Sequence, residues 1–211
     1  MSPHVVSVNV GRPRVVPRGS GTARTAIWKE PVSGPVAARG VNLEGDEQVD
    51  HRFHGGPDKA IYAYASEDTA WWEAQLGREL GPGVFGENLT VAGLDLSAME
   101  VGQRWRIGTV ELEVCQPRLP CYKLGLRFGD PRMLKRFVKA GRTGTYLRIV
   151  QEGVLEAGQP IGVSEAPGHG VTVALIAAAF HDDRRLAAKM LDAPQLPAHW
   201  RAWALDPSAP V

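Results

Sequence analysis

Residues 101–124, VGQRWRIGTVELEVCQPRLPCYKL, join a predicted β-hairpin to a turn that carries a cysteine. Two runs, 101–107 and 110–115, flank a glycine-threonine turn, and the second run alternates apolar and polar side chains. This period of two is typical of a strand with one face in a core. The alternation places Cys115 on the polar face unless a β-bulge intervenes. The stretch therefore predicts an antiparallel sheet that leads directly into the cysteine turn.

Short strands separated by glycine- and proline-rich turns recur along the rest of the chain. Further strands are expected at 4–10, 25–29, 60–65, 146–150 and 154–163, with a loop from 11 to about 22. The 24 glycines and 16 prolines favour a turn-rich β architecture over a helical bundle. We therefore predict a mainly β fold, a barrel or rolled sheet with a few short helices.

Helices are expected at five places, and the last three follow a glycine- and proline-rich stretch at 166–170. The ranges are 66–76, 131–140, 173–180, 184–191 and 197–205, with Ser66, Asp130 and Thr172 as caps. The change in composition divides the chain into a barrel domain at 1–165 and a three-helix appendage at 166–211. So short an appendage needs another surface to complete its core.

The composition argues against several classes of protein. Basic and acidic residues almost balance, 24 against 23, which argues against a protein that coats nucleic acid. Two cysteines do not make a disulfide scaffold, and no run approaches the roughly 20 apolar residues of a membrane helix. The first residues also lack the pattern of a signal peptide. We expect a cytoplasmic protein with neither nucleic-acid nor membrane partners.

Cys121 is the strongest candidate for a metal ligand or nucleophile. Pro117 and Pro120 stiffen the turn before it, because proline fixes φ and removes a backbone donor. Arg118 and Lys123 flank it, and neighbouring cations favour thiolate over thiol. Thiolate binds soft metals and attacks electrophiles. The turn predicts one activated, positioned sulfur, with an inert packing cysteine as the alternative.

Two glycine-bearing motifs offer further ligand-binding groups. In HGGPDKA, Gly55 and Gly56 let backbone amides approach a ligand closely, and Lys59 adds a positive charge. This combination suits a phosphate or another anionic group. In FGENLT, Glu87 and Asn88 can read the edge of a heterocycle through hydrogen bonds. An ordinary turn is the alternative for each motif.

Charged side chains elsewhere leave two more interpretations open. His51 and His54 are three residues apart near carboxylates, yet no matching Cys or His pair stands at zinc-ligand spacing, so a charged loop is favoured. Six cations adjoin apolar strands or glycine turns: Arg24, Lys29, Lys59, Arg118, Lys123 and Arg142. Loops gathered at one end of a barrel would turn them into an anion pocket.

Four motifs in order resemble the MOSC domain family, in its YiiM-like bacterial branch. They are NLEGDEQ (42–48), HGGPDKA (54–60), FGENL (85–89) and QPRLPCYKL (116–124). The tail from 171 to 201 is similar to the small three-helix domain that follows the barrel in that branch. Four ordered motifs and the tail cover most of the chain, so together they are far more specific than any one of them.

The resemblance implies a β-barrel that binds the molybdenum cofactor, with Cys121 as the thiolate ligand of molybdenum. It implies reduction of N-hydroxylated compounds, such as hydroxylaminopurine base analogues, as a detoxification. A separate reductase must supply the electrons, since the chain has no ferredoxin-type cysteine cluster. Pyridoxal phosphate binding is a further description that the resemblance allows.

Roles for the remaining residues follow from motif position and chemistry. The cofactor-holding set comprises Lys29, Gly55, Gly56, Lys59, Arg118 and Lys123. Glu87 and Asn88 would orient the cofactor or substrate, and His54 would relay a proton, since its ordinary pKa is near neutrality.

Two other functions remain open from the residues alone. Cys121 could carry a persulfide in a sulfur-carrier protein. The barrel could instead be a non-enzymatic module that binds a small anion, with the tail used for dimerisation. A homodimer is compatible with all three functions, because the apolar side chains of the tail need a partner surface.

Overall fold

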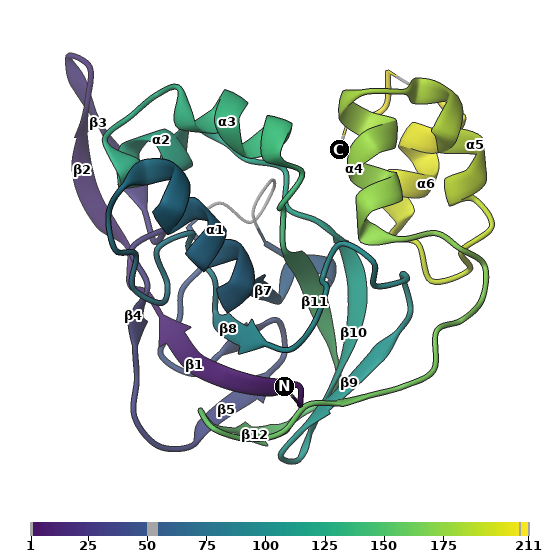
Figure 1. Ribbon diagram of the computed structural model, residues 1–211, viewed down its shortest axis with the longest axis horizontal. Coiled ribbons are helices and arrows are strands. Elements are labelled where there is room, and N and C mark those ends of the chain that lie inside the picture. Colours follow the sequence, from purple (N-terminus) through teal and green to yellow (C-terminus); the bar gives the residue numbers. More distant parts are fainter. Residues whose placement is uncertain (1, 50–54, 207, 211) are drawn as a thin grey trace.

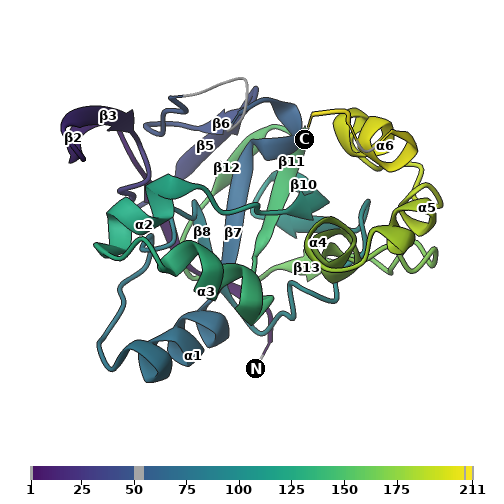
Figure 2. The same ribbon diagram turned by 90° about the horizontal axis from the view of Figure 1, so that it is seen from above.

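A curled eight-stranded sheet forms the body of the protein, and helices lie above it in two groups (Figure 1). The computed structural model describes residues 2–49, 55–206 and 208–210. Seen from above, helices α1–α3 and helices α4–α6 lie on opposite sides of strands β7 and β11 (Figure 2). The prediction of a mainly β, barrel-like fold with a few short helices is confirmed.

Neighbouring strands of the main sheet are antiparallel, except that β7 and β8 are parallel. In spatial order the strands are β13 (Gly162–Val163), β9 (Arg104–Ile107), β10 (Val110–Pro117), β11 (Thr145–Gln151), β7 (Ile61–Ala65), β8 (Leu89–Ala92), β1 (His4–Val10) and β4 (Glu30–Pro31). A smaller sheet contains β12 (Gly153–Leu155), β5 (Val36–Arg39) and β6 (Asn42–Leu43). Strands β2 (Arg14–Arg18) and β3 (Gly21–Thr25) pair with each other as a separate ribbon.

The helices are short, and within the described ranges none is long and apolar enough to cross a membrane. They are α1 (Ser66–Leu76), α2 (Tyr122–Phe128), α3 (Met133–Ala140), α4 (Val173–His181), α5 (Ala187–Met190) and α6 (Ala198–Leu205), with 3-10 turns η1 (Pro57–Lys59) and η2 (Arg184–Leu186). As predicted, α1 ends at Gly77, whose left-handed φ of 64° suits glycine.

Three local predictions are wrong, and one helix was not predicted. The strand expected at 25–29 ends at Thr25, and its partner is β2, in a stretch expected to be a loop. The strand expected at 154–163 divides into β12 and β13, separated by a turn that contains Gly158. Residues 122–128 form a helix, although Gly125 weakens the helical pattern. Helix α3 begins at Met133, two residues after the expected start.

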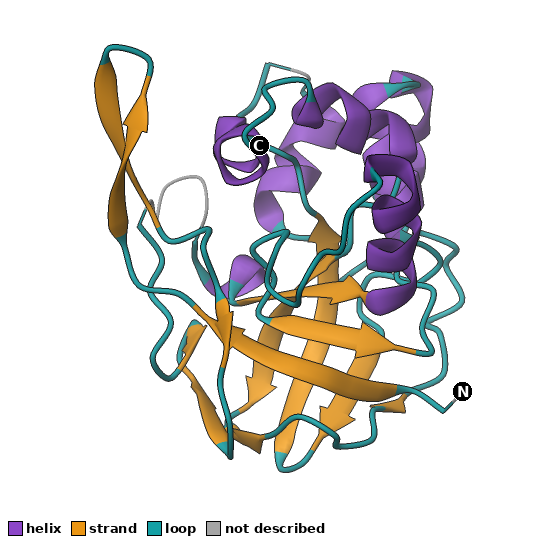
Figure 3. Ribbon diagram, turned by 60° about the vertical axis from the view of Figure 1, so that its left-hand side comes forward, coloured by secondary structure: helices purple, strands orange, loops and turns teal. Residues whose placement is uncertain are grey.

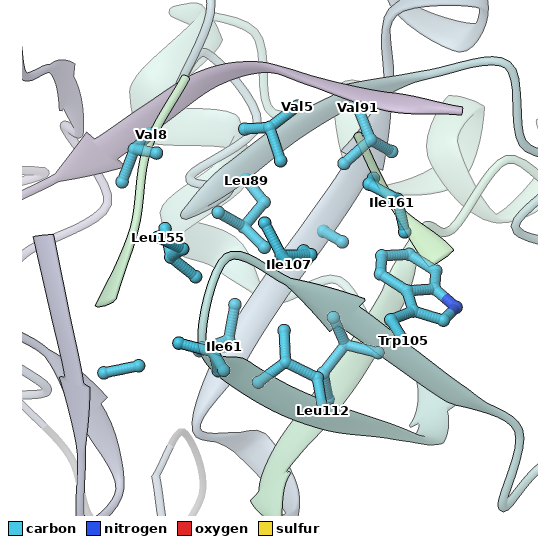
Figure 4. Close-up of a cluster of buried hydrophobic side chains, with 14 of the residues drawn as sticks. Val5, Val8, Ile61, Leu89, Val91, Trp105, Ile107, Leu112, Leu155 and Ile161 are labelled. Carbon is cyan, nitrogen blue, oxygen red and sulfur yellow. The ribbon is translucent and has the colours of Figure 1, made fainter. Parts of the chain in front are cut away.

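The main apolar core lies inside the curled sheet (Figure 4). Val5 and Val8 of β1 point toward Ile61 of β7 and Leu112 of β10, and each of these side chains is fully buried. Burial of one such side chain contributes about 1.5–3 kcal/mol. The core therefore fixes the strands whose ends and loops carry the polar residues described below.

A second core packs α1 and α3 against the outer face of the sheet. Tyr64 stacks on Phe85 with ring centroids 4.3 Å apart, and Trp72 donates a 2.9 Å hydrogen bond from Nε1 to the Tyr64 hydroxyl. Phe137 of α3 stacks on Trp72. These rings hold the loop before β8 against the sheet, and that loop carries the motif at 85–89.

The C-terminal residues form the three expected helices, the second of them divided into η2 and α5. Thr172 caps α4, and its hydroxyl accepts a 3.1 Å hydrogen bond from the backbone N–H of Leu175. The helices share a core with Val101, which precedes β9, so their apolar faces are completed by the barrel. The division of the chain at residue 165 stays a prediction.

One glutamine of β10 joins the C-terminal helices to the barrel. The side-chain oxygen of Gln116 accepts hydrogen bonds from Trp200 Nε1 at 2.7 Å and from His199 Nε2 at 3.0 Å. Its amide nitrogen donates to the backbone carbonyl of Asp58 at 3.0 Å. Because Asp58 lies in η1, Gln116 links α6 to the turn that carries Lys59.

Acidification should weaken this joint through His199. Burial, together with the nearby Lys59 charge, lowers the pKa of His199 from 6.5 to about 4. Between these values the unfolded chain binds a proton that the folded chain does not, so stability falls as pH drops from 6.5 to 4.

The measurement is urea unfolding of the wild type and of His199→Gln across that range. The variant is expected to lose less stability on acidification. His4→Gln in β1 controls for a general effect of this exchange. Equal acid sensitivity of wild type and His199→Gln would contradict the prediction.

Candidate functional site

A pocket lies between the end of β3, the turn η1 and the start of α2. It brings together six of the residues singled out in the sequence: Lys29, Lys59, Asn88, Arg118, Cys121 and Lys123. Its volume is about 90 Å³.

Cys121 stands at the boundary between a strand and a helix. Strand β10 ends at Pro117, and Cys121 is the N-cap of α2, with extended backbone angles of φ −121° and ψ 173°. Its carbonyl accepts a 2.9 Å hydrogen bond from the backbone N–H of Leu124. The side chain is partly buried and lines the pocket. The proline-rich turn therefore presents the sulfur to a cavity.

Cys115 has a different environment, although it is only six positions away. A bulge in the pairing of β10 with β11 occurs between Val114 and Gln116, and the Cys115 side chain is fully buried. Arg148 donates from Nε to the Cys115 sulfur at 3.0 Å, yet burial raises the pKa of this thiol to about 12. Cys115 is a neutral packing residue, and both cysteines are free thiols.

Lys29 is held in the pocket wall by Asp46. The ammonium lies 2.5 Å from both carboxylate oxygens, and both residues are buried. Asp46 also accepts hydrogen bonds from the backbone N–H of Gly11 at 2.7 Å and from Asn88 Nδ2 at 2.9 Å. Burial lowers the pKa of Lys29, and the Asp46 charge opposes that change. Asp46 therefore connects Lys29 and Asn88 of the pocket lining to Gly11, a role that the sequence did not predict.

Arg118 contributes a buried guanidinium beside Cys121. It donates from Nη1 to the carbonyl of Phe85, lies 4.9 Å over the ring of Tyr62 and interacts electrostatically with Cys121. Tyr62 and Tyr146 also line the pocket, and burial raises the pKa of both phenols, which keeps them neutral. Neither tyrosine was assigned a role from the sequence.

Two further lysines complete the positive lining. Lys59 ends the 3-10 turn η1, and Lys123 lies in the first turn of α2. Burial lowers the pKa of Lys59, opposed by the neighbouring Asp58 charge. With Lys29 and Arg118, the pocket gathers four of the six cations that the sequence analysis grouped.

The structure places several predicted residues away from the pocket. Glu87 is buried, and its carboxylate accepts hydrogen bonds from the backbone N–H groups of Gly83 at 2.6 Å and Phe85 at 3.0 Å. The carboxylate therefore holds the loop at 83–87 in place, and burial raises the pKa of Glu87. Gly55 and Gly56 do not line the pocket.

Two of the grouped cations also fall outside the pocket lining. Arg24 is exposed on β3, and Arg142 forms an ion pair with Asp68. His54 and His51 lie outside the described residues. Among the residues that are described, no three His, Cys, Asp or Glu side chains are grouped as a metal site.

The donor set fits an anionic cofactor that takes one thiolate from the protein. The lining combines the Cys121 sulfur, four cationic side chains and two neutral phenols with the carboxylates of Asp46 and Glu47. Thiolate is the ligand type that soft and redox-active metals prefer, and guanidinium and ammonium groups bind phosphate. Any metal held here by this chain would need most of its ligands from the cofactor itself.

Comparisons with known proteins identify the family to which this chain belongs. The model of the MOSC domain matches residues 50–162, which is more than half of the chain. Protein YiiM of Escherichia coli (strain K12) is 32% identical over 160 residues, which cover 74% of this chain and 70% of that protein.

A solved structure and a longer relative agree with this match. The crystal structure of YiiM from Geobacillus stearothermophilus has a TM-score of 0.79 at 34% identity and covers 96% of this chain and 97% of its own. A protein named reductase from Gibberella moniliformis (strain M3125 / FGSC 7600) is 34% identical over 151 residues, 70% of this chain and 27% of that protein. The chain therefore belongs to the MOSC domain family.

Proposed function

We propose that this chain binds a molybdenum cofactor in the Cys121 pocket and reduces N-hydroxylated compounds to amines. The observation that carries the proposal is the position of Cys121, a partly buried free thiol in a pocket with four cations. Membership of the MOSC family and the reductase-named relative support an oxidoreductase with such a cofactor.

Cations of the pocket would hold the anionic part of the cofactor. Arg118 has five N–H donors, and one of them is used by the Phe85 carbonyl, so others remain for an anion. Lys59 and Lys123 add charge on the two sides formed by η1 and α2. The Asp46 carboxylate neutralises the charge of Lys29. Lys29 therefore holds the pocket lining in place and adds no net positive charge.

Cys121 would be the protein ligand of molybdenum. Arg118 interacts electrostatically with this sulfur, so its guanidinium lies where it can act on a ligand bound there. When bound, the cofactor supplies two-electron chemistry at the substrate oxygen. The overall reaction consumes R–NHOH, two electrons and two protons and yields R–NH₂ and water.

Side chains of the pocket would orient the substrate and supply a proton. Tyr146 remains neutral because burial raises its pKa, so its hydroxyl can donate a hydrogen bond to the N–OH group. Lys59 is a better proton donor than Tyr146, because burial lowers the pKa of the Lys59 ammonium. The proton relay by His54 stays a prediction, since His54 lies outside the described residues.

Anaerobic turnover tests the proposal. Protein produced in a host that makes molybdenum cofactor is mixed with 6-hydroxylaminopurine and reduced methyl viologen. We expect adenine to form with two equivalents of viologen oxidised for each adenine. Cofactor-loaded protein that leaves the substrate unchanged would rule out this reaction.

A further inference from the structure

The β2–β3 ribbon projects from the body of the protein, away from the sheet (Figure 3). Its two strands pair only with each other within the described part of the chain. Val15 lies opposite Arg24 in the antiparallel register, so their side chains share one face of the ribbon. Val15 is 66% exposed. An isolated ribbon that presents an apolar side chain beside an arginine is suited to contact another protein.

The ribbon and the residues that flank it carry charged side chains of positive sign only. Residues 11–29 contain four arginines and one lysine and no acidic residue, although the whole chain has a net charge of only +1. The arginines, at positions 12, 14, 18 and 24, are all exposed. Arg14 pairs with Glu30 at 3.3 Å, beyond the end of the segment. The ribbon is therefore a local positive surface on a protein that is nearly neutral.

The ribbon is directly connected to the Cys121 pocket. Strand β3 ends at Thr25, which lines the pocket, and the following Ala26 and Ile27 continue that lining. On the other strand, the Arg18 guanidinium lies 3.8 Å over the ring of Tyr122. Tyr122 is next to Cys121 in the chain, so a protein bound to the ribbon would lie beside the mouth of the pocket.

We propose that the β2–β3 ribbon is the docking surface for an acidic electron-transfer protein. This inference rests on the proposed function, which consumes two electrons for each substrate reduced. The partner is a reduced flavoprotein with a negatively charged surface, which gives up two electrons and leaves oxidised. The two protons come from solvent through the pocket. Charge complementarity would speed the encounter and orient the partner toward the pocket.

Direct binding tests the docking surface without any turnover. Titration calorimetry of the holoprotein with oxidised bacterial flavodoxin, an acidic flavoprotein, should give an affinity that falls as salt is raised. Arg12→Glu/Arg24→Glu should weaken binding by about 10-fold or more. Arg106→Glu/Arg185→Glu, on β9 and η2, makes the same change of charge on exposed arginines elsewhere and should bind like the wild type.

Turnover separates a failure of this inference from a failure of the proposed function. Flavodoxin-driven reduction should slow in Arg12→Glu/Arg24→Glu, while viologen-driven reduction should match the wild type. Equal flavodoxin binding by both double variants, or binding of a DNA oligonucleotide in place of flavodoxin, would overturn the docking surface. Absence of viologen-driven reduction in the wild type would instead overturn the proposed function and leave the binding result standing.

Discussion

Replacing Cys121 with serine is expected to lower reduction of an N-hydroxylated substrate by about 100-fold or more. Serine has nearly the same shape, so the turn between β10 and α2 should keep its structure. Its hydroxyl is not ionised near neutral pH and is a hard ligand, so it cannot replace a soft thiolate on molybdenum. The measurement is kcat with reduced methyl viologen as the donor, and thermal unfolding checks the fold.

Cys115→Ser is the matched control for this experiment. Cys115 is fully buried, its pKa is about 12 and it does not line the pocket. This variant should keep most of the activity, at the cost of a modest loss of stability, because serine places a hydroxyl in a packed site. Full activity of Cys121→Ser, or equal losses in the two variants, would contradict the assignment of the ligand.

Replacing Asp46 with alanine is expected to lower the free energy of unfolding by about 3–5 kcal/mol. The change leaves the buried Lys29 ammonium without its counter-charge, and it removes the acceptor for Gly11 N–H and Asn88 Nδ2. Each unsatisfied buried donor costs roughly 1–3 kcal/mol. Urea unfolding measures the loss.

Two further variants separate the buried pair from a general effect of removing aspartate. Asp95→Ala removes an exposed carboxylate that caps the N–H groups of Ser97 and Ala98, and should cost about 1 kcal/mol. Lys29→Met/Asp46→Leu removes both buried charges and should be more stable than Asp46→Ala. An Asp46→Ala protein as stable as the wild type would show that the network is unimportant.

Local sequence patterns predicted the cysteine turn and most of the cations of the pocket. Proline spacing and flanking charge pointed to Cys121, and glycine-bearing motifs pointed to Lys59 and Asn88. Their convergence could not be predicted, because it comes from the curling of the sheet. Tyr62 and Tyr146 illustrate this, since the pairing of β7 with β11 places them opposite each other although 84 positions separate them in the sequence.

Buried carboxylates with hydrogen bonds to the protein itself were the hardest to interpret. Glu87 belongs to a motif with ligand-binding chemistry, yet its carboxylate is used by backbone N–H groups a few residues away. Asp46 belongs to a quoted motif but gained its role only from Lys29 and Asn88, which other elements supply. Sequence patterns identify such polar side chains, whereas packing decides whether they face a ligand or the protein.

Two short elements, the β2–β3 ribbon and helix α2, were not predicted because their local sequence signals are weak. The β2–β3 ribbon contains prolines, glycines and arginines that are typical of a loop, and its pairing is satisfied by two five-residue strands. Helix α2 has seven residues and a glycine in its interior, so its propensity is weak. Burial of Leu124 against the aromatic core stabilises it instead.

The central claim is that the Cys121 sulfur attaches a molybdenum cofactor to this chain. The most direct measurement is the molybdenum and pterin content of wild-type and Cys121→Ala protein, both purified from a host that makes the cofactor. We predict equimolar molybdenum and pterin in the wild type and a large loss of both in the variant. A wild-type protein free of molybdenum and pterin, or a variant that retains them fully, would contradict the account.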